Sequence, residues 1–373
     1  MSRTSRPVVL MVHDYPPFTG GGLALGVREI AAALDDDFSF RVLSSRPRDH
    51  FADDRHRLDA PDGESETVST FASPRRALRW LREADAIVLH WTFSFRRLST
   101  LLLVAAPLLR KPTVFVVHTA PDHCDYNRLR HLPLGLRGML VWFAGTAARR
   151  CSQVVALSHT HAAALTRTGF PSPHVVFLPV AAHLYDCAWH RRERRPVRTV
   201  MILGELSELK GADAIPGLLP VLTSDFRVRI AGRGPFARVV ESAAAALPAA
   251  SRANVEISDR VEPSQVVRLY DEADCLLVLS RTESMSRVTL EAMLSGVIVL
   301  ARPVGGIRDL VVDDRTGYLI DPDDPASVLE VLLRLARNPS KVDRVRRRAQ
   351  AFASRACATS RRRWRQILLD VTS

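Results

Sequence analysis

Hydrophobic residues in this chain gather into short runs that are separated by segments of helical periodicity. In the first half these runs occupy residues 7–12, 41–45, 86–89, 113–117, 154–158 and 175–179, and in the second half residues 199–203, 227–231, 275–279 and 297–301. Short, largely apolar runs of this kind are typical of buried parallel strands. Helical patterns lie between them, for example at residues 23–34, 74–83, 97–110, 288–295 and 340–373. The alternation predicts an α/β protein with parallel sheets.

Length and composition indicate a globular protein with two domains. The chain has 373 residues, which exceeds one ordinary core, because domains of about 150 residues are usual. Hydrophobic residues make up 47% and charged residues 25%. No apolar run reaches the roughly 18 residues that a membrane span needs, and the N-terminus lacks the pattern of a signal peptide. We therefore expect a cytoplasmic protein.

The cysteines indicate whether a disulfide framework or a zinc site is expected, and the net charge indicates which classes of partner are expected. The five cysteines are scattered without C-x-x-C spacing, so neither a disulfide framework nor a zinc site is predicted. A net charge of +12 would suit nucleic acid, an anionic membrane or a polyanionic small molecule. Aromatic residues total only 6% and do not alternate with basic ones, so nucleic acid is not expected. The basic segment 74–83 permits peripheral contact with an anionic membrane, although a surface helix over the sheet is the favoured interpretation.

Two carboxylates stand out in residues 281–306, RTESMSRVTLEAMLSGVIVLARPVGG. Glu283 follows a predicted strand, and Glu291, with seven residues between them, lies in the first turn of the predicted helix. Gly305 and Gly306 follow the next strand. Loops at the carboxyl ends of parallel strands meet at one edge, so these residues are expected to share a crevice. Taken alone, two glutamates at this spacing would also fit the solvated face of a helix.

The pattern Glu-x7-Glu, Ala-Met, apolar strand and Val-Gly-Gly resembles the donor-site signature of the retaining family-4 glycosyltransferases. Residues 307–335 are similar to the same family's continuation through a Thr-Gly-x-Leu element. The resemblance implies the GT-B architecture, in which two Rossmann-like domains face a central cleft. It implies an acceptor domain at residues 1–185, a linker at 186–197, a donor domain at 198–354 and a C-terminal helix at 355–373 that crosses back to the first domain.

The first half offers a glycine-rich loop and a histidine as site candidates. A strand, three glycines and a helix leave backbone N–H groups free for an anionic ligand, although a plain turn gives the same pattern. By resemblance this is the family's first loop, so Gly21 and Gly22 are expected to bind the donor. His118 follows the strand at 113–117, on the ligand side of the sheet. By resemblance it orients the donor sugar, and a structural histidine is the alternative.

The second half begins with residues 204–211, GELSELKG, which resemble the family motif Gly-Arg-Leu-x-x-x-Lys-Gly. A lysine at a helix N-terminus is unfavourable unless an anion lies beside it, and a diphosphate would serve. By resemblance Lys210 contacts the phosphates, and its being one of only three lysines in the chain argues against an ordinary surface residue. Glu205 replaces the motif's arginine, a reversal of charge. We expect Arg302, or failing it Arg287 or Arg233, to supply the missing cation.

The resemblance implies transfer of a sugar, with retention, from a nucleotide-diphospho-sugar to a small-molecule, lipid or glycan acceptor. Lys210 and the Gly305 and Gly306 amides would stabilise the departing diphosphate. Glu283 would hold the donor sugar and Glu291 the ribose hydroxyls. No metal is expected, since protein donors meet the phosphate charge, and no cofactor beyond the donor substrate. The expected catalytic residues are His118, Lys210 and Glu283, and the expected donor-binding residues are Gly21, Gly22, Lys210, Glu291, Arg302, Gly305 and Gly306.

Two alternatives remain at this point. One is another enzyme on the same fold, a nucleotide-sugar epimerase or phosphorylase, although no pattern of paired catalytic acids with a histidine is recognisable. The other is a catalytically silent subunit that keeps the nucleotide site, which Glu205 favours. Asp259 stands where a glycine is common in the family, so the base is left open, as are the sugar and the acceptor.

Overall fold

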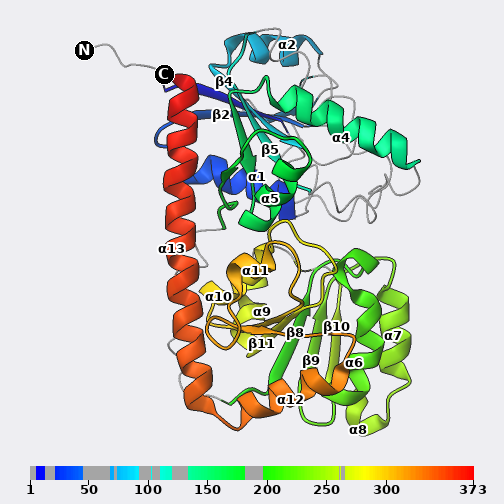
Figure 1. Ribbon diagram of the computed structural model, residues 1–373. Coiled ribbons are helices and arrows are strands. Elements are labelled where there is room, and N and C mark those ends of the chain that lie inside the picture. Colours follow the sequence, from blue (N-terminus) through cyan, green and yellow to red (C-terminus); the bar gives the residue numbers. More distant parts are fainter. Residues whose placement is uncertain are drawn as a thin grey trace. The chain divides into compact units, whose positions relative to one another are not determined.

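The computed structural model describes residues 6–12, 22–44, 68–70, 74–91, 102, 110–119, 133–180, 196–259, 261 and 265–373. The chain divides into two compact units, one of Met1–Pro179 with Cys357–Ser373 and one of Val180–Ala356. Each unit contains a parallel sheet with helices packed against it (Figure 1). The predicted α/β class, with two Rossmann-like domains, is confirmed.

The first unit is built on a parallel sheet in the order β3-β2-β1-β4-β5-β6-β7. Its strands are β1 (Val8–Val12), β2 (Ser39–Ser44), β3 (Val68–Thr70), β4 (Ala86–Trp91), β5 (Thr113–Val117), β6 (Gln153–Ala156) and β7 (His174–Val175). Its helices include α1 (Gly22–Ala33), α2 (Pro74–Glu83), α4 (Leu134–Ala148) and α5 (His159–Arg167). The sequence predicted most of these elements, with small differences at their ends.

Strand β4 is two residues longer than predicted. His90 and Trp91 continue the strand because they pair with Val116 and Val117 of β5. The helix predicted at 97–110 lies outside the described residues except for Leu102 and Arg110. The strand predicted at 175–179 is limited to His174–Val175.

The second unit has a parallel sheet in the order β10-β9-β8-β11-β12-β13. Its strands are β8 (Thr199–Leu203), β9 (Arg227–Ala231), β10 (Val255–Ser258), β11 (Cys275–Val278), β12 (Ile298–Ala301) and β13 (Tyr318–Leu319). Its helices include α6 (Ile215–Leu222), α7 (Ala237–Ala245), α8 (Ala249–Arg252), α9 (Val266–Glu272), α10 (Arg287–Leu294), α11 (Ile307–Leu310) and α12 (Pro325–Ala336). The strand order is that of a dinucleotide-binding Rossmann sheet.

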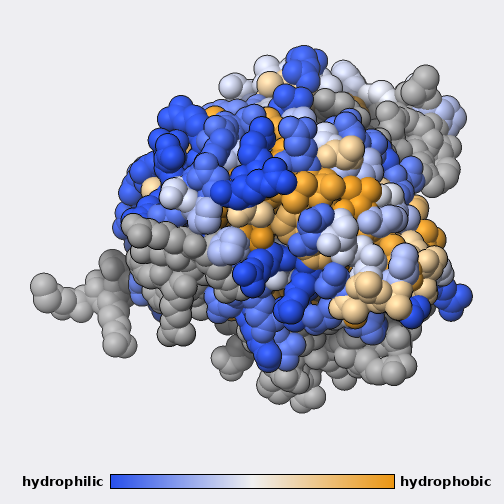
Figure 2. Space-filling view, turned by 90° about the horizontal axis from the view of Figure 1, so that it is seen from below, coloured by the Kyte–Doolittle hydropathy of each residue, from blue (hydrophilic) through white to orange (hydrophobic). Residues whose placement is uncertain are grey.

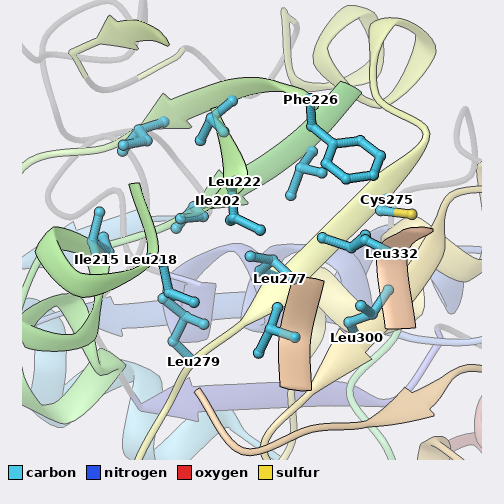
Figure 3. Close-up of a cluster of buried hydrophobic side chains, with 14 of the residues drawn as sticks. Ile202, Ile215, Leu218, Leu222, Phe226, Cys275, Leu277, Leu279, Leu300 and Leu332 are labelled. Carbon is cyan, nitrogen blue, oxygen red and sulfur yellow. The ribbon is translucent and has the colours of Figure 1, made fainter. Parts of the chain in front are cut away.

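The core of the second unit explains why its strands are so apolar. Parallel strands covered on both faces need hydrophobic side chains at nearly every position. Ile202, Leu277 and Leu300 extend from β8, β11 and β12 toward Leu218 of α6 and Leu332 of α12 (Figure 3). All of these side chains are buried, so the sheet supplies a rigid base for the loops that follow its strands.

The long helix α13 (Pro339–Thr372) contributes to both units. In the first unit the Trp364 Nε1 donates to the carbonyl oxygen of Phe177 at 2.9 Å, and the Arg365 guanidinium bonds to both carboxylate oxygens of Asp37. Most of the predicted linker, residues 186–195, lies outside the described part.

Hydrophilic and hydrophobic residues share the surface of the protein. The face in Figure 2 is largely hydrophilic, with a smaller group of hydrophobic residues on it. None of the helices described is long and apolar enough to cross a bilayer.

Candidate functional site

Two loops of the second unit meet at the point where its strand order reverses. From β8 the chain proceeds outward through β9 and β10, and it then returns to β11 on the other side of β8. Connections that leave adjacent strands in opposite directions open a crevice at the carboxyl end of the sheet, the usual ligand site of such folds. The residues after β8 and β11 are those with the family-like motifs.

Lys210 and Glu283 join these two loops. The Lys210 Nζ lies 2.6 Å from Glu283 Oε1, with the lysine side chain 35% exposed and the glutamate 9%. Ser280 Oγ donates to the same carboxylate oxygen at 2.8 Å. One carboxylate oxygen of Glu283 therefore has at least two hydrogen-bond donors. An ammonium has three donors, so the lysine can hold Glu283 and a second acceptor together.

The prediction that Lys210 stands at a helix N-terminus is wrong. It ends a 3₁₀ turn, Glu208–Lys210, and a second 3₁₀ turn, Ala212–Ala214, separates it from α6. Gly211 between the turns has φ +70°, and a Cβ there would clash with the Leu279 carbonyl oxygen. The turn thus brings Lys210 against the β11 loop, so its position depends on the glycine rather than on a helix terminus.

Gly305 and Gly306 hold the backbone of Glu283. Gly305 has φ +45°, and a Cβ there would clash with the Glu283 carbonyl oxygen. The Gly306 N–H donates to that same oxygen at 2.8 Å. The Gly306 N–H already has an acceptor, so it could donate to a phosphate only by sharing its hydrogen between two acceptors. The contact that the structure shows for the glycine pair is with the Glu283 backbone.

Glu291 is buried in α10 and has two partners. Arg287 Nε donates to Oε1 at 2.6 Å, and the Tyr270 hydroxyl donates to Oε2 at 3.0 Å. The helix begins at Arg287, which places Glu291 in its second turn rather than the predicted first. The residue is 7% exposed, and its carboxylate is fixed by both neighbours.

Each of the three arginines expected to replace the missing cation contacts a carboxylate. Arg302 donates from both terminal nitrogens to Asp323 at 3.0 Å each, and these bonds hold the pKa of the Asp323 carboxyl below its usual value. Its Nε also donates to the Leu279 carbonyl oxygen. Arg233 bonds to Asp259 at 2.6 Å, and Arg287 holds Glu291. Arg302 is therefore anchored beside the β11 loop by its own acidic partner.

Glu205, the residue at the motif's arginine position, is exposed. It follows Gly204, which has φ +137° after β8. The Glu205 backbone oxygen accepts from the Ser207 N–H at 3.0 Å. Because its side chain lies in solvent, this carboxylate has the freedom to turn away from an anion.

Sequence reasoning missed three hydroxyl groups of this site. Ser280 bonds to Glu283 and Tyr270 to Glu291. The third is Thr282, whose Oγ1 is buried and has no hydrogen-bond partner in the part of the chain that the structure describes. Thr282 directly precedes Glu283, which was the only signal in the sequence that pointed to it.

In the first unit, His118 pairs with a second histidine. His118 Nε2 lies 2.8 Å from His90 Nδ1, with the rings stacked at 5.1 Å between centroids, and both side chains are buried. The sequence did not predict His90 as a partner of His118, because the strand was expected to end at residue 89. Gly22 is the first residue of α1, whereas Gly21 lies outside the described residues.

A metal centre was not expected, and within the described ranges no group of three or more His, Cys, Asp or Glu is arranged to hold a metal ion.

Comparison with known families identifies the class of this protein. Residues 20–182 match the model of Glycosyltransferase Family 4, and residues 190–352 match that of Glycosyl transferases group 1. Together the two matches take in nearly the whole chain. The chain belongs to the family-4 glycosyltransferases of GT-B fold, a family of transferase enzymes.

Two relatives are similar in sequence to part of this chain. The D-inositol 3-phosphate glycosyltransferase of Xylanimonas cellulosilytica is 33% identical over 183 residues, which cover 47% of this chain and 42% of the relative. That of Streptomyces avermitilis is 31% identical over 164 residues, 41% of this chain and 35% of the relative. The chain thus matches less than half the length of these relatives.

Solved structures match over the whole chain at low identity. HepE of Anabaena in complex with UDP has a TM-score of 0.73 at 18% identity, covering 97% of this chain and 99% of HepE. Sucrose-phosphate synthase from Thermosynechococcus elongatus has a TM-score of 0.70 at 15% identity, covering 98% of this chain and all of the other. At this identity the likeness shows the fold alone.

Proposed function

We propose that the protein transfers a sugar, with retention at the anomeric carbon, from a nucleotide-diphospho-sugar to an acceptor. The observation that carries the proposal is the Lys210–Glu283 pair, which joins the loops after β8 and β11 at the reversal of strand order. That location is where such a sheet binds nucleotides. Family membership supplies the reaction class.

We assign the two glutamates the different roles that the family resemblance implies. Glu283 would accept from hydroxyls of the donor sugar while Lys210 and Ser280 hold its carboxylate in place. Glu291, fixed by Arg287 and Tyr270, would accept from the vicinal ribose hydroxyls. The sugar would then lie near the β11 loop and the nucleoside along α10.

Electrostatic stabilisation of the leaving group would be the main catalytic contribution. As the glycosidic bond breaks, negative charge accumulates on the diphosphate and positive charge on the sugar. Lys210 can donate to a phosphate oxygen without releasing Glu283, because an ammonium has three donors. Arg302 would add a second cation. A reaction supported in this way needs no metal ion at the phosphates.

The donor and acceptor are suggested by the relatives. HepE is solved with UDP and with UDP-glucose, which supports a nucleotide-sugar donor. Relatives named D-inositol 3-phosphate glycosyltransferases make an inositol phosphate the first acceptor to test. His118, which pairs with His90, would orient the donor sugar, as the family resemblance implies.

A catalytically silent nucleotide-binding subunit is the second candidate, and Glu205 favours it. A carboxylate where the family has an arginine would repel a diphosphate unless it turns away. Lys210, Glu283 and Glu291 would in that case bind a nucleotide without transferring its sugar.

The experiment incubates the full chain with a panel of nucleotide sugars, with and without inositol phosphate and glycan acceptors, and measures free nucleoside diphosphate and glycosylated product. Transfer by the wild type, and its loss in Lys210→Ala, is the expected result. Lys341→Ala is the matched control, since it removes another lysine–carboxylate pair, with Asp314, from the same unit. Nucleotide binding with no product under any pairing would favour the silent subunit.

A further inference from the structure

Helix α4 presents large apolar side chains to solvent. Most of the exposed large hydrophobic residues in the described part of the chain belong to it: Leu136 (36% exposed), Met139 (55%), Trp142 (67%) and Phe143 (36%). Others, such as Val239 and Val312, stand singly on other elements. Isolated exposed hydrophobic residues are ordinary, whereas a cluster on one helix indicates something that covers it.

The spacing places these side chains on one side of the helix. Residues 136, 139 and 143 follow the i, i+3, i+7 pattern of a helix face, and Trp142 lies beside them. The opposite side, with Ala144 and Ala148, is fully buried in the core of the first unit. The sequence LGLRGMLVWFAGTAA has no acidic residue. Arg137 is its one charged residue. Apolar side chains therefore lie on the exposed side of this helix as well as on the side that meets the protein core.

Helix α2 brings positive charge to the same side of the sheet. Its buried residues Ala77 and Trp80 belong to the same hydrophobic cluster as Ala144 and Ala148 of α4, so both helices cover one face (Figure 1). The outer side of α2 exposes Arg75, Arg79 and Arg82. Basic and apolar groups thus occur together on neighbouring helices.

We propose that this side of the first unit docks on an anionic membrane surface, with the exposed face of α4 in the boundary between headgroups and acyl chains. The α2 arginines would contact lipid phosphates, each adding attraction near an anionic surface. Tryptophan favours this boundary, and Trp142 is the most exposed of the four side chains.

Charge and length distinguish this occupant from others. The chain carries a net charge of +12, so a second copy would bring like charge to the arginines, whereas lipid phosphates bring the opposite charge. Helix α4 has 15 residues and is about 22 Å long, against a hydrocarbon core of about 30 Å. It therefore lies on the membrane and does not span it. The inference does not depend on the sugar-transfer reaction.

The test measures binding of the full chain to vesicles by flotation. Neutral phosphatidylcholine vesicles are compared with vesicles that contain phosphatidylglycerol. We expect binding to the anionic vesicles that weakens with salt. Met139→Ser with Trp142→Ser should reduce it at least about tenfold, because each apolar side chain withdrawn from the boundary weakens binding. Val239→Ser with Val312→Ser, a matched change at two exposed apolar residues of the second unit, should leave it unchanged. Arg75→Gln with Arg79→Gln and Arg82→Gln should abolish the preference for anionic lipid.

Fluorescence reports the position of Trp142 directly. Trp80, Trp91 and Trp364 are buried, and Trp189 lies outside the described residues. The measurement is therefore made in Trp189→Phe, where a blue shift of emission on adding anionic vesicles is expected to come from Trp142. Trp142→Phe should remove that shift and retain most of the vesicle binding. Circular dichroism verifies that each variant is folded. Absence of vesicle binding, or equal binding by the α4 and control variants, would overturn the proposal. So would a concentration-dependent dimer that only the α4 variant loses, because the face would then be an interface between copies.

Discussion

Lys210 Nζ lies 2.6 Å from Glu283 Oε1, although 73 residues separate them along the chain. The pair forms only because β8 and β11 are neighbours in the sheet. In the absence of a ligand, the Lys210 ammonium and the Glu283 carboxylate are paired with each other. A bound diphosphate would share the lysine, so phosphate binding and sugar binding are expected to be coupled through this contact.

Lys210→Ala tests the phosphate contact. Loss of charge-assisted hydrogen bonds should weaken nucleoside diphosphate binding by about 1.5–3 kcal/mol, or about 10- to 150-fold. Calorimetric titration measures the affinity, and turnover should fall at least as much. Lys341→Ala controls for the loss of one lysine. Full affinity and turnover in Lys210→Ala would contradict the role given to Lys210.

Glu291→Gln and Glu283→Gln should separate the nucleotide from the sugar. Glu291→Gln removes an acceptor for the ribose hydroxyls and should weaken binding of the nucleoside diphosphate itself. Glu283→Gln leaves the ribose acceptor Glu291 in place and keeps a side-chain oxygen that can accept from Lys210, so nucleotide affinity should hold while transfer falls. Both affinities are measured by titration with nucleoside diphosphate. An equal loss of affinity in the two variants would refute this division.

The sequence predicted the sheets well because parallel strands buried on both faces need continuous apolar runs. It placed Glu283 and Lys210 in loops at one sheet edge for the same reason. Local conformation was harder to predict. The 3₁₀ turn at Lys210 depends on Gly211 packing against Leu279, and that contact is between residues far apart in the chain.

The partners of the site residues could be predicted only in part. Arg287 and Glu291 stand four residues apart, so their pairing on α10 follows from helical spacing. The bonds from Tyr270 to Glu291 and from Arg302 to Asp323 join separate elements. Side-chain contacts of this kind depend on tertiary packing, and the hydrophobic periodicity of the sequence does not predict them.

Thr282→Val should have opposite effects on the stability of the ligand-free protein and on its affinity for the donor. The Thr282 hydroxyl is buried without a partner among the described residues, and an unsatisfied buried hydroxyl costs about 1–3 kcal/mol. Replacing it with a methyl group should therefore raise the melting temperature of the ligand-free protein. If the hydroxyl bonds to the donor, the same variant should bind the nucleotide sugar about threefold to tenfold more weakly. Thr282→Ser keeps the hydroxyl and serves as the control. Unchanged donor affinity in Thr282→Val would remove Thr282 from the site.

Asp274 is expected to be the acidic residue on which the second unit's stability most depends. One of its carboxylate oxygens accepts the backbone N–H groups of Arg198 and Thr199 at 3.0 Å each, and the other faces the buried Arg346. Asp274→Ala would leave the arginine charge buried and should cost about 3–5 kcal/mol. Thermal unfolding measures the loss. Asp274→Asn with Arg346→Met removes both charges, keeps the volume and leaves a side-chain oxygen that can accept the two backbone N–H groups, so it should be milder. Equal losses in the two proteins would contradict the argument.

Arg302 is the first candidate for the second cation at the diphosphate. It is anchored by Asp323 and reaches the Leu279 carbonyl beside the β11 loop. A guanidinium presents parallel donors that lysine cannot reproduce, so Arg302→Lys should already lower turnover and Arg302→Ala should lower it about as much as Lys210→Ala. Arg287→Ala and Arg233→Ala are measured alongside. Full activity in all three alanine variants would mean that none of them supplies the charge.

Glu205→Arg tests whether the reversed charge limits the enzyme. Glu205 is exposed, so the substitution disturbs no buried contact, and it restores the residue type found in the family's motif. An added cation beside the departing diphosphate should stabilise the charge that develops there, so turnover should rise and nucleoside diphosphate affinity should increase, more at low salt than at high salt. Glu208→Arg makes the same change of charge at an exposed residue three positions along the loop and serves as the control. An equal gain in both variants would reflect the general field of the protein, whereas a gain in Glu205→Arg alone would show that this position faces the leaving group. No gain in either would mean that another cation already neutralises the diphosphate.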